Sequence, residues 1–122
     1  MKLRIRGDSL RLRLTQPEVA LLAERGLVED SIAFAAGARL TYALVCSGAK
    51  LAAKLDGPRV EVTVPVDLAR AWAASDTVGL EGNQDAGDGR TLRILVEKDY
   101  ACLTKRPNED DTDAFPNPNT SC

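Results

Sequence analysis

Residues 2–14, KLRIRGDSLRLRL, alternate between apolar and mostly basic side chains over almost their whole length. A period of two is typical of strands that bury one face. Gly7-Asp8 interrupts the alternation, and a glycine there can supply the positive φ that a two-residue hairpin turn requires. The stretch therefore predicts a hairpin in which Ile5 lies opposite Leu10, Leu3 lies opposite Leu12, and the apolar side chains face the interior.

The predicted turn contains Arg6-Gly7-Asp8, a tripeptide that is also a cell-adhesion motif. An adhesion ligand needs an export route, but the N-terminal residues include no apolar signal core. Short motifs also recur by chance. We therefore interpret the tripeptide as a turn and expect a cytoplasmic protein, because no apolar run is long enough to span a membrane.

Two helices and several further strands are expected along the chain. Thr15 to Glu18 has the pattern of a capping box, which predicts a helix over 16–25 that ends at Gly26. A second, shorter helix is expected over 66–75, with Leu68 and Trp72 on its buried face. The expected strands are 27–35, 38–46, 59–65, 77–81 and 91–99; the segment 49–56 is compatible with strand or helix, and strand is favoured.

These elements predict an α+β fold with two helices and a curled, mainly antiparallel sheet of seven or eight short strands, for which a barrel-like closure is one arrangement. Side chains Val28, Ile32 and Phe34 are expected to face inward. The glycine-rich stretch 82–89 is expected to be a loop, and the sequence shows no internal repeats. Residues 1–106 form the expected single domain, and 107–122 an irregular acidic segment rich in Pro and Asn.

The composition argues against several kinds of chemistry. The chain has no histidine, which removes the commonest general base and the commonest transition-metal ligand. Its three cysteines, Cys46, Cys102 and Cys122, are widely spaced and form neither a disulfide framework nor a zinc motif. We therefore expect a non-enzymatic protein without a cofactor.

The charge distribution is the main functional signal. In the predicted hairpin Arg4 lies opposite Arg11 and Lys2 opposite Arg13, and like charges across a strand pair are destabilising. An anionic ligand could compensate, which makes Lys2, Arg4, Arg11 and Arg13 the candidate anion-binding residues. The chain's own acids are the other candidates, namely Glu61, Glu97 or the acidic run Glu109, Asp110, Asp111 and Asp113.

Two functions follow from this arrangement. The favoured one is a binding or interaction protein in which the basic hairpin and the acidic C-terminal segment meet across one sheet face. The alternative is a phosphate- or nucleotide-binding protein or a metal-assisted phosphohydrolase, in which Glu61, Glu97 and Asp99 would hold Mg²⁺. The partner is an unknown protein or a small anion; nucleic acid is not favoured, because the aromatic residues are not interleaved with the basic ones.

The two ends of the chain carry a resemblance. MKLRIRGDSLRLRLTQPEV at the start and LVEKDYACLTKRPNEDDTDAFPNP near the end resemble the signatures of a family of small uncharacterised bacterial proteins. The resemblance implies a single-domain protein of bacterial origin. It carries over no catalytic residue, because that family has no established activity.

Overall fold

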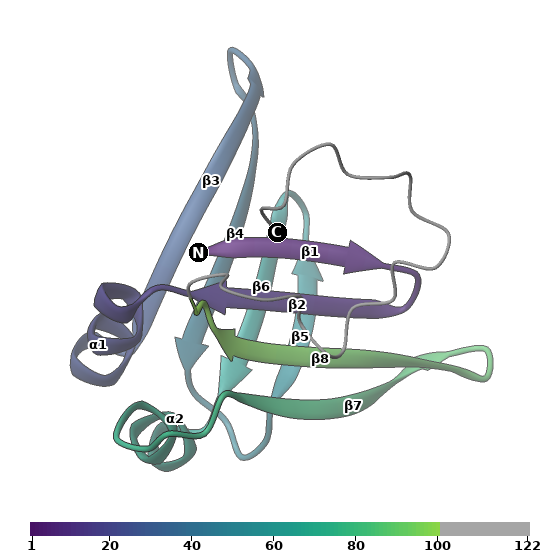
Figure 1. Ribbon diagram of the computed structural model, residues 1–122. Coiled ribbons are helices and arrows are strands. Elements are labelled where there is room, and N and C mark those ends of the chain that lie inside the picture. Colours follow the sequence, from purple (N-terminus) through teal and green to yellow (C-terminus); the bar gives the residue numbers. More distant parts are fainter. Residues whose placement is uncertain (101–122) are drawn as a thin grey trace, which may run out of the picture.

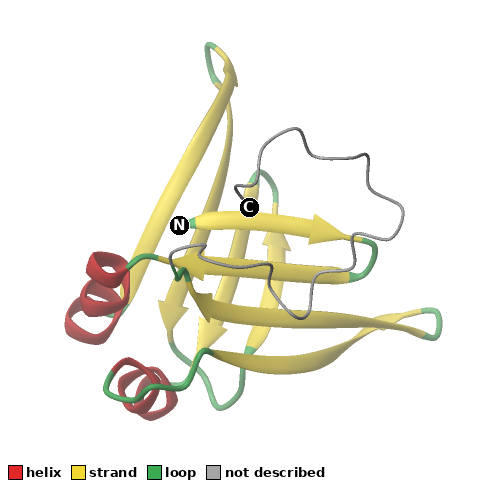
Figure 2. Ribbon diagram, in the orientation of Figure 1, coloured by secondary structure: helices red, strands yellow, loops and turns green. Residues whose placement is uncertain are grey.

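A computed structural model describes residues 1–100 and shows two helices and eight strands, which confirms the α+β class (Figure 1). Both helices lie at the same end of the strands (Figure 2). Neither described helix is long and apolar enough to cross a membrane. The elements are β1 (Lys2–Arg6), β2 (Ser9–Leu14), α1 (Gln16–Arg25), β3 (Leu27–Ala35), β4 (Ala38–Cys46), β5 (Ala52–Asp56), β6 (Arg59–Val64), α2 (Val66–Ala73), β7 (Gly79–Gly87) and β8 (Arg90–Lys98).

The strands are divided between two four-stranded sheets. Sheet A has the order β1-β2-β8-β7, and sheet B has the order β3-β4-β6-β5. Each sheet consists of two antiparallel hairpins joined at its centre by one parallel pair, β2 with β8 in sheet A and β4 with β6 in sheet B. The strands are thus mainly antiparallel as expected, but they form two mixed sheets and not one closed barrel.

The first hairpin has the predicted register. Ile5 pairs with Leu10 and Arg4 with Arg11, and Gly7 in the turn has a φ of 55°. The aspartate of the Arg-Gly-Asp tripeptide has a structural role, because Asp8 forms an ion pair with Arg90 at the start of β8. The interpretation of the tripeptide as a turn is confirmed.

The two halves of the chain repeat one ββαββ unit. Elements β1, β2, α1, β3 and β4 correspond in order to β5, β6, α2, β7 and β8. Exchanging the halves converts the strand order of sheet A into that of sheet B. Each sheet therefore contains the first hairpin of one unit and the second hairpin of the other. The expectation of no internal repeat is wrong at the level of structure.

Details of the backbone follow the same correspondence. The Arg93 amide donates to the Asp8 carbonyl at 2.8 Å, and the Thr41 amide donates to the Pro58 carbonyl at 2.9 Å at the equivalent place. Gly37 and Gly89 occupy equivalent turns with φ values of 76° and 73°. Both second hairpins also have an irregularity in register just before this turn. The repeat thus extends to individual hydrogen bonds.

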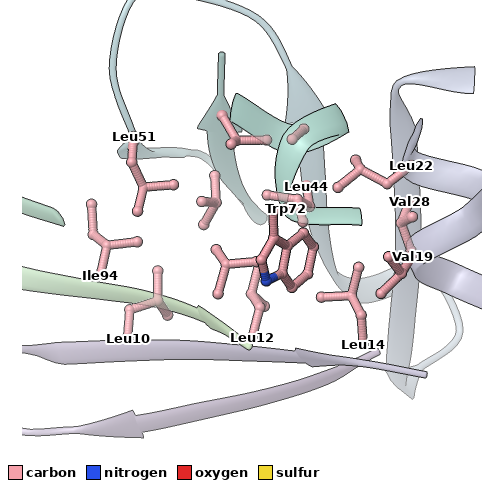
Figure 3. Close-up of a cluster of buried hydrophobic side chains, with 14 residues drawn as sticks. Leu10, Leu12, Leu14, Val19, Leu22, Val28, Leu44, Leu51, Trp72 and Ile94 are labelled. Carbon is pink, nitrogen blue, oxygen red and sulfur yellow. The ribbon is translucent and has the colours of Figure 1, made fainter. Parts of the chain in front are cut away.

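The core lies between the inner faces of the two sheets and extends to the helices. Trp72 of α2 lies among core side chains from both sheets, near Leu12 and Leu44 (Figure 3). Its indole N–H donates to the Val78 carbonyl at 3.3 Å, so the one polar atom of this buried side chain is satisfied. The equivalent position in α1 is Leu22, which is also buried. Each unit therefore contributes one helical anchor to the same core.

Helix α1 begins as the sequence predicts. The Glu18 carboxylate accepts hydrogen bonds from the backbone and the hydroxyl of Thr15, at 2.9 and 3.0 Å. The N-terminal ammonium of Met1 forms an ion pair with the same carboxylate. The left-handed Gly26 ends the helix.

Several expectations need correction. Residues 82–87 belong to β7, so the polar stretch predicted as a loop is one arm of a long hairpin. Ile32 alternates with the buried Val28 but is 50% exposed, and Phe34, at the register irregularity of β3, is 73% exposed, because both lie beyond the part of sheet B that the core covers. In α2 the buried partner of Trp72 is Ala69, whereas Leu68 is 41% exposed. The segment 49–56, favoured as strand, contains β5.

Candidate functional site

The outer face of sheet A is strongly basic. The leucines of β2 alternate into the core, so the residues between them point outward, as do the corresponding residues of β1 and β8. We call this surface the basic face, and its members are Lys2, Arg4, Arg6, Arg11, Arg13 and Arg93.

One carboxylate lies between two of these arginines. Glu97 Oε1 is 3.0 Å from Arg11 Nε and 3.5 Å from Arg13 Nε. The Arg11–Glu97 contact has ion-pair distance without hydrogen-bond geometry. All three side chains are about four-fifths buried, which reduces solvent screening of their charges. Among the residues that the structure describes, the Glu97 carboxylate is thus shared by two arginines at the centre of the basic face.

The edge of the basic face has fewer internal partners. Lys2 Nζ lies 3.1 Å from an Asp99 carboxylate oxygen, and Arg93 Nε lies 2.9 Å from Glu81 Oε1. Arg4 and Arg6 are exposed and make no ion pair within residues 1–100. Within the described part of the chain, these two guanidinium groups on β1 thus have no acidic partner. The acidic run at 109–113, expected to neutralise this face, lies outside the described residues.

The equivalent surface of sheet B has a different charge pattern. Lys54 of β5 pairs across the strands with Glu61 of β6, with 3.2 Å between Lys54 Nζ and Glu61 Oε2. Arg59 continues the network to Glu61 at 3.4 Å and to Glu29 of β3 at 2.6 Å. The outer face of sheet B is therefore crossed by alternating charges that pair with one another.

The two surfaces can be compared residue by residue. Lys54 and Glu61 occupy the positions in the second unit that Arg4 and Arg11 occupy in the first. The same backbone thus carries an attractive pair in one unit and a like-charge pair in the other. Since like charges directly across two strands are destabilising, the fold does not need the arginine pair. This comparison singles out the basic face as a functional candidate.

The structure does not bring together the residues of the Mg²⁺ alternative. Glu61 lies on the outer face of sheet B, whereas Glu97 lies on the outer face of sheet A and Asp99 directly follows β8. The two outer faces are on opposite sides of the molecule (Figure 1). Within residues 1–100 no group of three or more acidic or cysteine side chains is arranged to hold a metal ion. The proposed triad of Glu61, Glu97 and Asp99 is therefore not one site.

The pKa values of three carboxylates are lowered by the groups that bind them. A hydrogen bond from Lys54, with a further contribution from Arg59, lowers the pKa of Glu61. The Arg90 side chain lowers the pKa of Asp8 in the turn of the first hairpin. Burial alone would raise the pKa of Glu18, but hydrogen bonds from the N-terminal ammonium and from Thr15 lower it on balance. These three groups are stabilised in their charged forms.

Sequence reasoning found four members of the basic face and missed two. Lys2, Arg4, Arg11 and Arg13 lie together on it as expected. Arg6 continues the same alternation on β1, and the sequence contained that signal. Arg93 joins the face only because β8 lies parallel to β2, where Arg93 pairs with Ser9. No local pattern indicates that pairing.

Comparison with known proteins identifies a family. Residues 1–119 match a family of unknown function, DUF7009. The chain belongs to this family. Neither the curated proteins nor the solved structures gave a match. Membership in DUF7009 agrees with the resemblance to an uncharacterised family and assigns no activity.

Proposed function

We propose that this protein is a non-enzymatic, cytoplasmic interaction protein of bacterial origin, whose basic face binds a carboxylate-rich partner. The observation that carries the proposal is the difference between equivalent positions of the repeat. Arg4 faces Arg11 where Lys54 faces Glu61, and the fold itself does not call for this like-charge pair. An anionic partner would offset the repulsion, because guanidinium groups bind carboxylates with paired hydrogen bonds.

The distribution of charge supports a macromolecular partner over a small ion. Six basic side chains extend along three neighbouring strands, and those on β1 are exposed. The most buried pair, Arg11 and Arg13, already shares Glu97. The accessible charge is therefore spread along an edge and suits a chain of carboxylates better than one phosphate.

The proposal is tested by calorimetry on the full chain with a short oligoglutamate peptide. We expect salt-sensitive binding that Arg4→Ala weakens and that Lys54→Ala, the matched change in the second unit, leaves unaltered. Pyrophosphate with Mg²⁺ serves as the comparison ligand for the phosphate-binding alternative. Tighter binding of pyrophosphate than of oligoglutamate, or equal effects of the two substitutions, would contradict the proposal.

A further inference from the structure

The two edge strands of the repeat, β1 and β5, differ in whether a side chain binds the backbone N–H and C=O groups on their outer edge. The Gln84 side chain of β7 reaches β5 and binds both backbone groups of Ala53. Its Nε2 donates to the Ala53 carbonyl at 2.7 Å, and its Oε1 accepts from the Ala53 amide at 2.9 Å. These groups point away from β6, so Gln84 covers the edge of sheet B at Ala53.

Among the side chains of residues 1–100, none covers the equivalent edge of sheet A in this way. Leu3 of β1 corresponds to Ala53, and Ile32 of β3 corresponds to Gln84. An isoleucine side chain can neither donate nor accept a hydrogen bond. Within residues 1–100 no side chain binds the backbone amide or carbonyl of Leu3 or Ile5. Strand β1 therefore presents an open edge, which is a template for an added strand.

Exposed apolar side chains accompany this open edge. Ile5 on β1 is 64% exposed, and Ile32 and Phe34 on β3 are 50% and 73% exposed. Ile5 and Ile32 point toward the inner side of their sheets, since Ile5 pairs with the core residue Leu10 and Ile32 alternates with Val28, whereas Phe34 lies at the register irregularity of β3. In the second unit, the positions of Ile32 and Phe34 hold Gln84 and Ala86. The position of Ile5 holds Leu55, which is 75% exposed, so the apolar contrast between the two units lies in the residues of β3 and β7.

From this contrast we infer that β1 accepts an extended segment of a partner protein as an additional strand of sheet A. This inference rests on the proposed function and specifies how the acidic partner binds. A strand beside β1 would place alternate side chains on opposite faces of the sheet. Its outward residues would lie beside Lys2, Arg4 and Arg6, and its inward residues beside the apolar side chains of β1 and β3. The matching segment therefore alternates acidic and apolar residues.

Charge selects this occupant over a second copy of the chain. Two β1 strands paired edge to edge would bring Lys2, Arg4 and Arg6 of both copies onto one surface. Such a pairing adds like-charge contacts across the new strand pair. An acidic strand instead offers each basic residue an opposite charge.

The test uses a fluorescent peptide in which Glu and Val alternate, with the full-length protein. A second peptide of the same length, in which some of the valines are replaced by proline, carries the same charge but cannot form a continuous strand. We expect the alternating peptide to bind about tenfold more tightly than the interrupted one by fluorescence anisotropy. Hydrogen exchange should show that the Leu3 and Ile5 amides become protected only when the alternating peptide is bound.

The repeat suggests a substitution that tests strand addition at β1 specifically. Ile32→Gln copies the cap that Gln84 forms over β5, so it should close the β1 edge and abolish the preference for the alternating peptide. Ile32→Val keeps an apolar side chain and should preserve that preference. Since Ile32 is half exposed, neither change removes a core contact.

Each other outcome is informative. If both peptides bind equally and Ile32→Gln changes nothing, strand addition is wrong, while oligoglutamate binding shows separately whether the basic face binds carboxylates. A dimer that Ile32→Gln dissociates in sedimentation would assign the edge to a second copy and overturn the inference. Protection of the Leu3 and Ile5 amides in the free monomer would also overturn it, because the edge would then be occupied by the chain itself.

Discussion

Gln84 binds both backbone groups of Ala53, and this contact joins the end of one sheet to the edge strand of the other. It is a side-chain substitute for a neighbouring strand. Two hydrogen bonds between a side chain and the backbone of a partly buried strand contribute on the order of 1 kcal/mol each. The contact thus stabilises sheet B and also occupies backbone groups of β5 through which another strand could pair.

Replacement of Gln84 should measurably lower the stability of the protein. We expect Gln84→Ala to lower the free energy of unfolding by about 1–2 kcal/mol in urea denaturation. Asn83→Ala changes the adjacent residue, which points outward and is exposed, and should have little effect. Equal effects of the two substitutions would show that the contact does not stabilise the fold.

Charge reversal at equivalent positions should have opposite effects. Arg4→Glu recreates in sheet A the opposite-charge pair found in sheet B and should stabilise the protein by a few tenths of a kcal/mol, up to about 1 kcal/mol. Lys54→Glu places two glutamates opposite each other and should lower the melting temperature. The measurement is thermal unfolding at low salt, and loss of stability in both variants would contradict the account.

The acidic run tests the internal neutralisation of the basic face. Replacing Glu109 by Gln, and Asp110, Asp111 and Asp113 by Asn, removes its charge while retaining the length of the chain. If these carboxylates offset the arginines, the variant should melt at a lower temperature than the wild type at low salt. This difference in melting temperature should become smaller at high salt. An unchanged melting temperature at both salt concentrations would reject that pairing.

The position of Trp72 makes α2 a test of the core. Trp72→Ala should lower the free energy of unfolding by about 3–5 kcal/mol, because it empties a buried site between the two sheets. Leu68→Ala on the exposed side of the same helix should cost far less. Comparable losses in urea denaturation would show that α2 packs through a different face.

The lowered carboxylate pKa values predict the effect of acid. Asp8, Glu18 and Glu61 all have a pKa below the ordinary value, which is 4.5 for the two glutamates. A group with a lowered pKa in the folded state stabilises the fold above its ordinary pKa, and this contribution is lost as the pH falls through the folded-state value. Stability should therefore decline below about pH 4.5. Glu18→Gln should reduce the slope of that decline, and an unchanged slope would contradict the assignment.

Local sequence patterns predicted the local structure well. The alternation over 2–14 fixed the register of the first hairpin, because a two-residue turn determines which residues face one another. The capping pattern at Thr15 located the start of α1 for a similar reason. Both features depend on interactions within a few residues of chain, which the sequence displays directly.

Features that depend on distant pairing were missed. The parallel contacts of β2 with β8 and of β4 with β6 join segments from different halves of the chain. The repeat was hidden in the sequence because equivalent positions hold different residues of the same polarity, such as the apolar Leu12 and Val62. The polar residues 82–87 were predicted as a loop because this arm of the β7–β8 hairpin has no period-two apolar pattern.

The most direct test of the basic face is an NMR titration of the full-length protein with oligoglutamate at low salt. The account predicts amide shifts on β1 and β2, centred on Arg4 and Arg11, and none at the equivalent residues Lys54 and Glu61. Shifts of equal size in both hairpins, or shifts confined to sheet B, would contradict it.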